Sequence, residues 1–321
     1  MVEVRLSRGV HLPGAKLWLD PRRRAQRAFV SHAHSDHTGR HDLTIATPAT
    51  LDLMALRMGR LKGELIPMDF GEAREFDEFT IRLVPAGHVL GSAQCYIETE
   101  EGSVLYTGDF KRRAGATSEA AGFCHAETLV IETTFGLPKY VFPPPEAVLP
   151  AIVEFCKSTL DAGATPALLA YSLGKAQEVL AALGAAGLAS MPHSSIVKLL
   201  PVYERAGYRF PGLVEWSDRR DAVIVCPPSS RNSLSGFKDL RTAVITGWAL
   251  DSATVFRSRC DAAFPLSDHA GYDDLLRHVE DVAPRRVLTL HGFAQEFARD
   301  LRARGIEAWA LTGPNQLDLP L

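Results

Sequence analysis

The 321-residue sequence contains no apolar run of about 18 residues or more, which excludes a membrane-spanning helix of ordinary length. Its first 19 residues mix charged side chains with glycine and proline, so they do not resemble a secretory signal peptide. Hydrophobic residues make up 46% of the chain, enough to fill the core of one large domain or of two. We therefore expect a globular, cytoplasmic protein that has no membrane partner.

Cysteine is scarce, and no two of the five cysteines form a Cys-X-X-Cys pair. Their odd number and wide separation argue against a disulfide framework and against a zinc site built from thiolates. We expect buried, unpaired thiols at Cys95, Cys124, Cys156, Cys226 and Cys260.

An excess of positive charge is also absent, because the formal net charge is -3 at pH 7. A nucleic-acid partner therefore cannot be predicted from the overall charge. Two local clusters stand out, Arg22 to Arg24 and Lys111 to Arg113. We expect the first to be a solvated face, whereas the second directly follows a candidate site residue, Asp109.

The pattern of apolar residues changes near residue 136. Short apolar runs bounded by turn residues predict strands before this point, and a proline-rich stretch, Gly136 to Pro145, follows. Helical and strand patterns then alternate, which is typical of a small α/β unit with a parallel sheet. We predict that residues 1–136 and 241–321 build one domain and that residues 137–240 are inserted into it.

The main chemical feature is a dense group of metal ligands in the stretch His32-Ala33-His34-Ser35-Asp36-His37. It follows a short apolar run, Ala28 to Val30, so these ligands are expected where a buried strand ends. Imidazole and carboxylate ligands without thiolate favour zinc, with manganese or iron also allowed.

Three further ligands occur at strand ends beside a glycine: His88 after Gly87, Asp109 after Gly108, and His291 before Gly292. The combined set divides between two metal ions, with a water molecule between them. We expect one ion on His32, His34 and His88, the other on Asp36, His37 and His291, and Asp109 shared by both.

These motifs resemble those of the metallo-β-lactamase fold. Three others resemble motifs of its β-CASP nuclease branch, namely Ile131 to Gly136, Ser267 to Ala270 and Leu290 to Gly292. The resemblance covers nearly the whole chain. It implies an α/β protein, an αββα sandwich with an inserted α/β β-CASP cap domain.

The same resemblance implies that Glu132 holds His269 and that His269 protonates the leaving oxygen. A carboxylate partner suits this role, because it raises the pKa of an imidazole and fixes its tautomer. The alternative is that Glu132 only pairs locally at a strand end. The expected catalytic residues are thus Asp36, Glu132 and His269, and the candidate substrate-binding residues are Lys111, Arg112, Ser172 and Lys175.

The resulting hypothesis is a metal-dependent phosphodiesterase, a nuclease with two zinc ions, most similar to bacterial ligase-associated DNA exonucleases and RNA 3′-end processing factors. DNA is the favoured substrate and RNA the alternative, and a link to DNA ligation follows from the resemblance only. A small-ester or thioester hydrolase of the same fold would share the metal ligands. A non-catalytic nucleic-acid binding module is the third alternative.

Overall fold

The computed structural model describes residues 1–311 and has a mixed α/β architecture with several sheets. The chain divides into two compact units. The first unit contains Met1–Ala114, Glu119–Val141 and the chain from His269 onward, and the second contains Gly115–Ser118 and Phe142–Asp268. Within the described residues, no helix is both long and apolar enough to cross a membrane.

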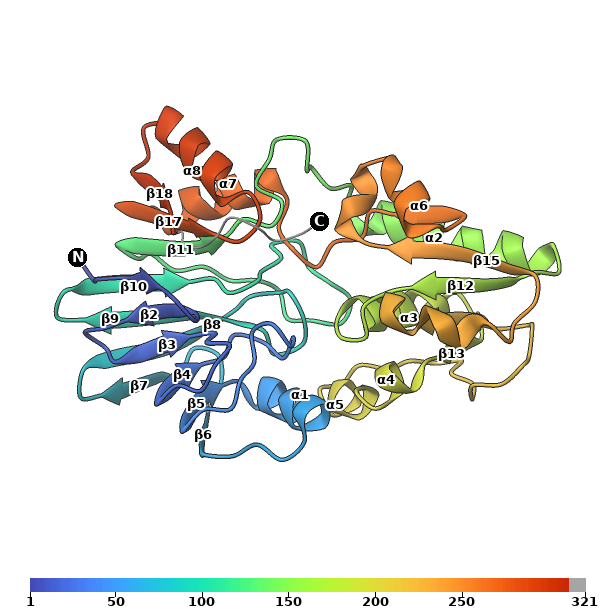
Figure 1. Cartoon of the computed structure of the whole chain (residues 1–321), viewed down its shortest axis with the longest axis horizontal. Coiled ribbons are helices and arrows are strands. Elements are labelled where there is room, and N and C mark those ends of the chain that lie inside the picture. The colour runs from blue at the N-terminus through green and yellow to red at the C-terminus, as the bar shows by residue number, and fades with distance from the viewer. Residues whose placement is uncertain (312–321) are drawn as a thin grey trace. The chain divides into compact units, whose positions relative to one another are not determined.

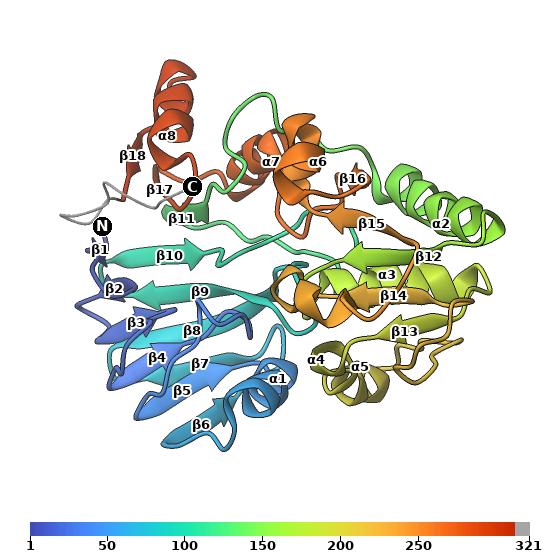
Figure 2. The same cartoon turned by 45° about the vertical axis from the view of Figure 1, so that its right-hand side comes forward.

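Two sheets form the first unit (Figures 1 and 2). The six-stranded sheet has the order β1 (Arg5–Leu6), β2 (Val10–Leu12), β3 (Leu17–Leu19), β4 (Arg27–Phe29), β5 (Leu43–Ala46) and β6 (Glu64–Pro67). The seven-stranded sheet has the order β18 (Ala308–Ala310), β17 (Arg286–Leu290), β11 (Thr128–Glu132), β10 (Gly102–Tyr106), β9 (Ala93–Thr99), β8 (Phe79–Pro85) and β7 (Ala73–Phe76).

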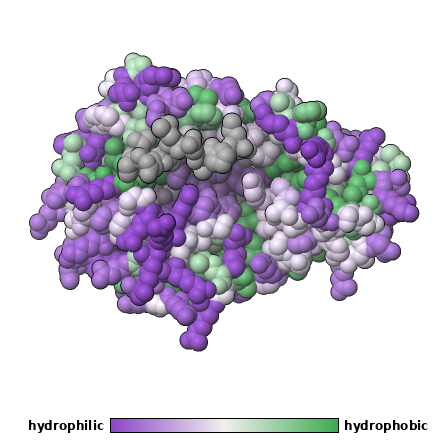
Figure 3. Space-filling view, viewed as in Figure 1, coloured by the Kyte–Doolittle hydropathy of each residue, from purple (hydrophilic) through white to green (hydrophobic). Residues whose placement is uncertain are grey.

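The core of this unit follows from the two-residue period of its strands. On β10, Val104 and Tyr106 belong to a hydrophobic cluster that also contains buried residues of β2 to β5, so the two sheets pack face to face. Leu105, between them, belongs to a second cluster with buried residues of α7 (Tyr272–Val282) and α8 (Ala294–Ala303). These two helices therefore cover the other face of the seven-stranded sheet. Hydrophilic side chains gather outside β2 to β7 (Figure 3).

The remaining helix of this unit, α1 (Pro48–Met58), begins at a polar cap. Thr47 Oγ1 accepts a hydrogen bond from the Thr50 amide at 3.2 Å, and proline at the first helical position suits a helix start. The helix ends at Gly59, which has a φ of 77°.

The second unit is built on a five-stranded parallel sheet of order β13 (Ser190–Pro192), β14 (Val223–Cys226), β12 (Thr165–Leu169), β15 (Leu240–Ile245) and β16 (Ala262–Phe264). The helices of this unit are α2 (Pro145–Asp161), α3 (Lys175–Ala185), α4 (Ser194–Val197), α5 (Leu200–Arg205) and α6 (Ala253–Ser258). Two 3-10 helices accompany them, η1 (Pro228–Leu234) and η2 (Gly247–Leu250). The parallel sheet expected for this part of the chain is confirmed.

The point at which the chain returns to the first unit differs from the expected residue 241. The strand β15 pairs with β12 and β16, and the return comes at His269. The return was expected too early in the chain because Ala243 to Ile245 is a fully buried apolar run. Such a run suits an inner strand of either sheet. Only the pairing partner assigns it to the second unit.

A buried histidine of α7 makes the folded state sensitive to acid. His278 is fully buried beside Phe110, and neither ring nitrogen has a hydrogen-bond partner among the described residues. Burial, aided by Arg112, lowers the pKa of His278 to about 3. An unfolded chain takes up the proton near the ordinary pKa of about 6.5, so below that pH the unfolded state binds more protons and the folded state loses stability.

We therefore expect His278→Leu to stabilise the protein relative to wild type, and more strongly at low pH. The gain in the free energy of unfolding should be about 1 kcal/mol larger at pH 5.5 than at pH 7.5. Urea unfolding of both proteins at the two pH values measures this difference. An equal gain at both pH values would contradict the assignment.

Candidate metal centre

The loop after β4 carries His32, His34 and His37, and a buried carboxylate holds its first turn. The backbone amide and Oγ of Ser31 donate to the two carboxylate oxygens of Asp20 at 2.7 and 2.6 Å. Because Ser31 Oγ gives its proton to Asp20, it accepts one from Nδ1 of His32, 2.9 Å away. The Nε2 lone pair of His32 is thereby left for a metal ion.

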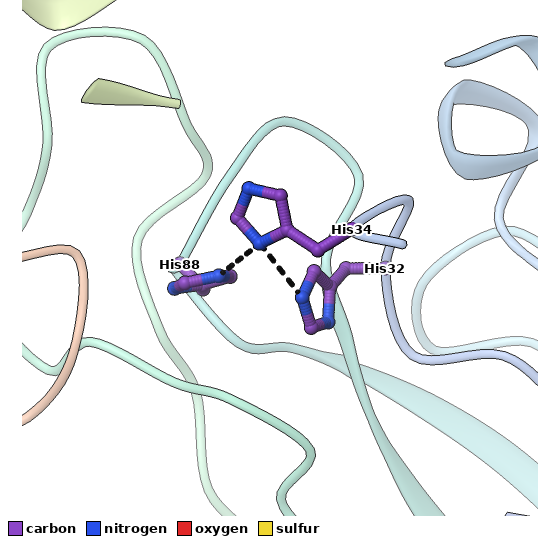
Figure 4. A group of neighbouring side chains, drawn as sticks. All are labelled: His32, His34 and His88. Carbon is purple, nitrogen blue, oxygen red and sulfur yellow. Dashed lines mark hydrogen bonds between the residues drawn. The ribbon is translucent and has the colours of Figure 1, made fainter. Parts of the chain in front are cut away.

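Three imidazoles converge beside this loop (Figure 4). Nε2 of His32 and Nε2 of His88 each lie 3.0 Å from Nδ1 of His34, and the three rings stand nearly perpendicular to one another. Burial, together with the neighbouring histidines, holds the pKa of His32 well below its ordinary value, so its ring is neutral at pH 7. Three imidazole nitrogens this close together could serve as ligands of one metal ion.

Two glycines bring later ligands into the same place. Gly87 has a φ of 75°, and a Cβ there would lie 2.4 Å from a backbone carbonyl oxygen, so only glycine allows the turn that carries His88. Gly108 has a φ of 54°, and its Cβ would lie 2.6 Å from the Ser31 side chain. The turn at Gly108 directs Asp109 from the end of β10 toward the imidazoles.

Asp109 is a buried carboxylate among histidines. Its Oδ2 lies 3.3 Å from His37 Nε2, 3.7 Å from His32 Nε2 and 3.9 Å from His88 Nε2. Burial alone raises the pKa of Asp109, but the imidazoles, His37 above all, hold it well below its usual value. Asp109 is therefore an anion at neutral pH, placed where it contacts all three rings.

Asp20, which the sequence analysis did not single out, belongs to this centre. Its Oδ2 accepts from His37 Nδ1 and from the Tyr106 hydroxyl, both at 2.8 Å. Burial lowers the pKa of His37, but Asp109 and Asp20 on its two ring nitrogens raise it well above the ordinary value. The signal was present in the sequence, because Asp20 directly follows the strand β3, as other site residues follow theirs.

We expect Asp20→Asn to weaken metal binding by about 10- to 100-fold, the usual cost of removing a partner that orients a ligand. Asparagine can keep the bond from the Ser31 amide, but it cannot supply the second carboxylate oxygen that orients His37. Metal retention against a chelator measures the change. Asp77→Asn, at an exposed position between β7 and β8, is the matched control, and equal metal affinity in both variants would exclude this role.

Two predicted ligands lie at the margin of the cluster. His291 follows β17 with a φ of 62°, and its ring centroid is 5.9 Å from that of His37. The Asp36 side chain is 60% exposed, and its Oδ2 lies 3.7 Å from His37 Nε2. Within residues 1–311, the groups whose ligand atoms lie within 4.8 Å of one another are His32/His34/His88, Asp20/His32/His37 and His88/Asp109/His269.

Glu132 and His269 form a pair beside the cluster. His269 Nδ1 lies 2.8 Å from Glu132 Oε1, and the His269 ring lies 4.8 Å from that of His88. Glu132 is 1% exposed and also accepts from the amides of Phe110 at 3.3 Å and Thr134 at 3.0 Å. The carboxylate is thus fixed on three sides and orients an imidazole that is 22% exposed. Glu132 and His269 are 137 residues apart in the sequence.

The candidate substrate-binding residues have internal contacts. Lys111 is buried, and the Arg112 guanidinium forms an ion pair with Asp281 of α7. In the second unit, Lys175 Nζ lies 2.7 Å from Asp268 Oδ2, and Ser172 Oγ lies 3.0 Å from Ser195 Oγ. Helix α3 is capped at Gly174, whose amide donates to the Gln177 side chain. A substrate phosphate would have to compete with the Asp268 carboxylate for Lys175.

Buried imidazoles and a carboxylate gathered at strand ends form a cluster that could hold a metal ion. No protein-family model matches the chain. A "Probable DNA ligase" of Opitutus terrae is 49% identical over 99% of this chain and 32% of its own length. "Transcription termination factor FttA" of Pyrococcus abyssi is 30% identical over 48% of this chain and 30% of its own length. The "RNase J-like protein" of Methanocaldococcus jannaschii is 28% identical over 47% of this chain and 42% of its own length.

The homologues of this chain therefore include β-CASP nucleases, which confirms the resemblance found in its motifs. The chain spans about a third of the Opitutus and Pyrococcus relatives and less than half of the Methanocaldococcus one. A solved structure of a protein of unknown function from Enterococcus faecalis V583 covers 84% of this chain and 76% of its own, with a TM-score of 0.57 and 15% identity. At that identity the likeness shows a common fold.

Proposed function

We propose that this chain is a metal-dependent nuclease that hydrolyses phosphodiester bonds of DNA, as an exonuclease. In this proposal the first unit is the αββα metallo-β-lactamase sandwich and the second unit is the β-CASP cap. The main support is that Asp109 and the imidazoles of His32, His37 and His88 converge, with the Glu132–His269 pair beside them. A simple ester hydrolase would need the first set but not the pair.

The residues present fit two zinc ions, with manganese or iron as substitutes. The donors are imidazole nitrogens and carboxylate oxygens, and no cysteine belongs to the ligand groups found in residues 1–311. His32, His34 and His88 would hold one ion, Asp36, His37 and His291 the other, and Asp109 both. When bound, such ions lower the pKa of a water molecule and stabilise negative charge on a phosphate.

The chain's own residues supply the proton and the orientation. His269 Nδ1 donates to Glu132, so its Nε2 is the atom that gives a proton to the departing oxygen. Glu132, held by the Phe110 and Thr134 amides, keeps that ring in place and stabilises its charged form. The exposed carboxylate of Asp36 is assigned to orient the attacking water next to His37.

DNA is favoured as the substrate because the relative named as a probable DNA ligase matches nearly the full chain at 49% identity. We further propose that the nuclease acts on DNA ends in a pathway that includes ligation, and in the cytoplasm. RNA is the alternative substrate, since relatives with RNase in their names match about half of the chain at 28% identity.

The test is incubation of the purified protein with 5′-labelled and 3′-labelled DNA and RNA, with zinc or manganese added. We expect single-nucleotide products from DNA and a much slower reaction with RNA, and the label that is released first gives the polarity. Faster digestion of RNA would reverse the choice of substrate. No cleavage of either polymer by metal-loaded protein, with hydrolysis of a model ester, would reject the nuclease assignment.

A further inference from the structure

Arg22 contacts the loop after β4 that carries His32, His34 and His37. The sequence had predicted only that Arg22 is exposed to solvent. Its Nε donates to the backbone carbonyl of Asp36 at 3.1 Å, and its own backbone amide is fixed by the Arg8 carbonyl at 2.8 Å. The side chain is exposed, and in the described part of the chain it forms no ion pair with a carboxylate.

A second arginine, on another element, interacts electrostatically with Asp36 of the same loop. Arg57 is half-buried in the last turn of α1, where burial lowers its pKa and Asp36 opposes that effect. No carboxylate among residues 1–311 lies within ion-pair distance of its guanidinium. Nearby arginines are paired, Arg24 with Asp42 at 2.6 Å and Arg27 with Glu78 at 2.8 Å.

A half-buried cation is partly removed from water, so an anion bound to it interacts more strongly than it would with a fully exposed arginine. A guanidinium presents a planar set of N–H donors that matches two phosphate oxygens at once. Arg22 uses one of its donors, Nε, on the loop, which fixes the direction of the remaining ones. Arg22 therefore has a fixed direction beside Asp36, and Arg57 adds a second positive charge near the same residue.

We propose that Arg22 and Arg57 bind a backbone phosphate of the nucleic-acid strand that neighbours the phosphodiester being cleaved. This inference rests on the proposed nuclease function and specifies its substrate, which must then carry at least two phosphates in a row. In this proposal the phosphate that reacts would lie at the histidines and Asp109, and the arginines would bind the next phosphate along the strand. A small ester or a single phosphodiester cannot occupy both places.

The experiment compares two substrates in metal-loaded wild type and in Arg22→Ala and Arg57→Ala. One substrate is a labelled single-stranded oligonucleotide, and the other is bis(p-nitrophenyl) phosphate, which has one phosphodiester and no neighbour. For each variant we expect the ratio of kcat/KM for the oligonucleotide to that for the small diester to fall about tenfold, mainly through KM. The salt dependence of oligonucleotide binding should become shallower by about 0.7 per arginine removed.

Arg23→Ala is the matched control, since Arg23 is an exposed arginine beside Arg22 that has no contact with the loop among those the structure describes. It should keep the wild-type ratio, and Arg22→Lys should recover part of the loss. Equal losses on both substrates, loss of metal, or an unchanged salt dependence in Arg22→Ala would overturn the inference and make Arg22 a support of the loop. Failure of wild type to cleave either substrate would instead reject the proposed function.

Discussion

Replacing Asp109 with alanine is expected to abolish metal binding and phosphodiester cleavage together. Its carboxylate lies between His32, His37 and His88, and it would supply the negative charge that a divalent ion needs beside imidazole ligands. Without it, the ring nitrogens that face Asp109 lose the anion that offsets the positive charge of a bound ion. Metal content of the purified variant and cleavage of labelled DNA should both fall to background.

A matched removal of a carboxylate separates this effect from a change in net charge. Asp218 is exposed in the second unit, so Asp218→Ala should retain the wild-type metal content and rate. Asp109→Asn adds a variant of nearly the same shape but without the charge. Normal turnover in Asp109→Ala would refute both the ligand set and the hydrolytic centre.

Replacing His269 with alanine should slow DNA cleavage by about 10² to 10⁴ fold while the metal content stays at the wild-type level. The reason is that His269 is paired with Glu132 and is proposed to donate a proton, whereas the proposed metal ligands do not include it. Metal analysis and single-turnover cleavage of labelled DNA measure the two quantities on the same preparation.

The leaving group gives the decisive comparison for His269. Nitrophenolate departs without a proton, so the loss of rate on bis(p-nitrophenyl) phosphate should be far smaller than the loss on DNA. Glu132→Gln should show the same selectivity in weaker form, because an amide still accepts a hydrogen bond from Nδ1 but no longer stabilises a charged ring. Equal losses on both substrates would mean that His269 supports the site without giving a proton.

Much of the candidate site could be predicted from the sequence, because its candidate ligands share one feature: they follow a buried strand at a turn. The structure brings five of the predicted ligands, His32, His34, His37, His88 and Asp109, into its groups of converging ligand atoms. Asp20 follows the same rule at the end of β3, yet a lone aspartate after a strand is too common to be noticed. Its role became visible only through its contacts with Ser31, His37 and Tyr106.

Charged residues were harder to interpret from sequence. Arg112 follows Asp109 closely and was expected near the substrate, but its guanidinium pairs with Asp281 of α7. Arg22 is exposed, as expected, and its Nε also donates to the Asp36 carbonyl, which the sequence did not indicate. Long side chains reach partners far away in the sequence, so neighbours along the chain do not predict what a guanidinium contacts.

The sequence by itself determined the strands, the turns that glycine permits and the kinds of donor atoms at their ends, because these depend on local backbone conformation and residue chemistry. Tertiary structure alone decided that β15 pairs within the second unit, that Asp20 orients His37 and that His269 meets Glu132 across 137 residues of chain. Such pairings depend on which sheet and which buried surface each segment reaches, and apolar patterns are alike in all of them.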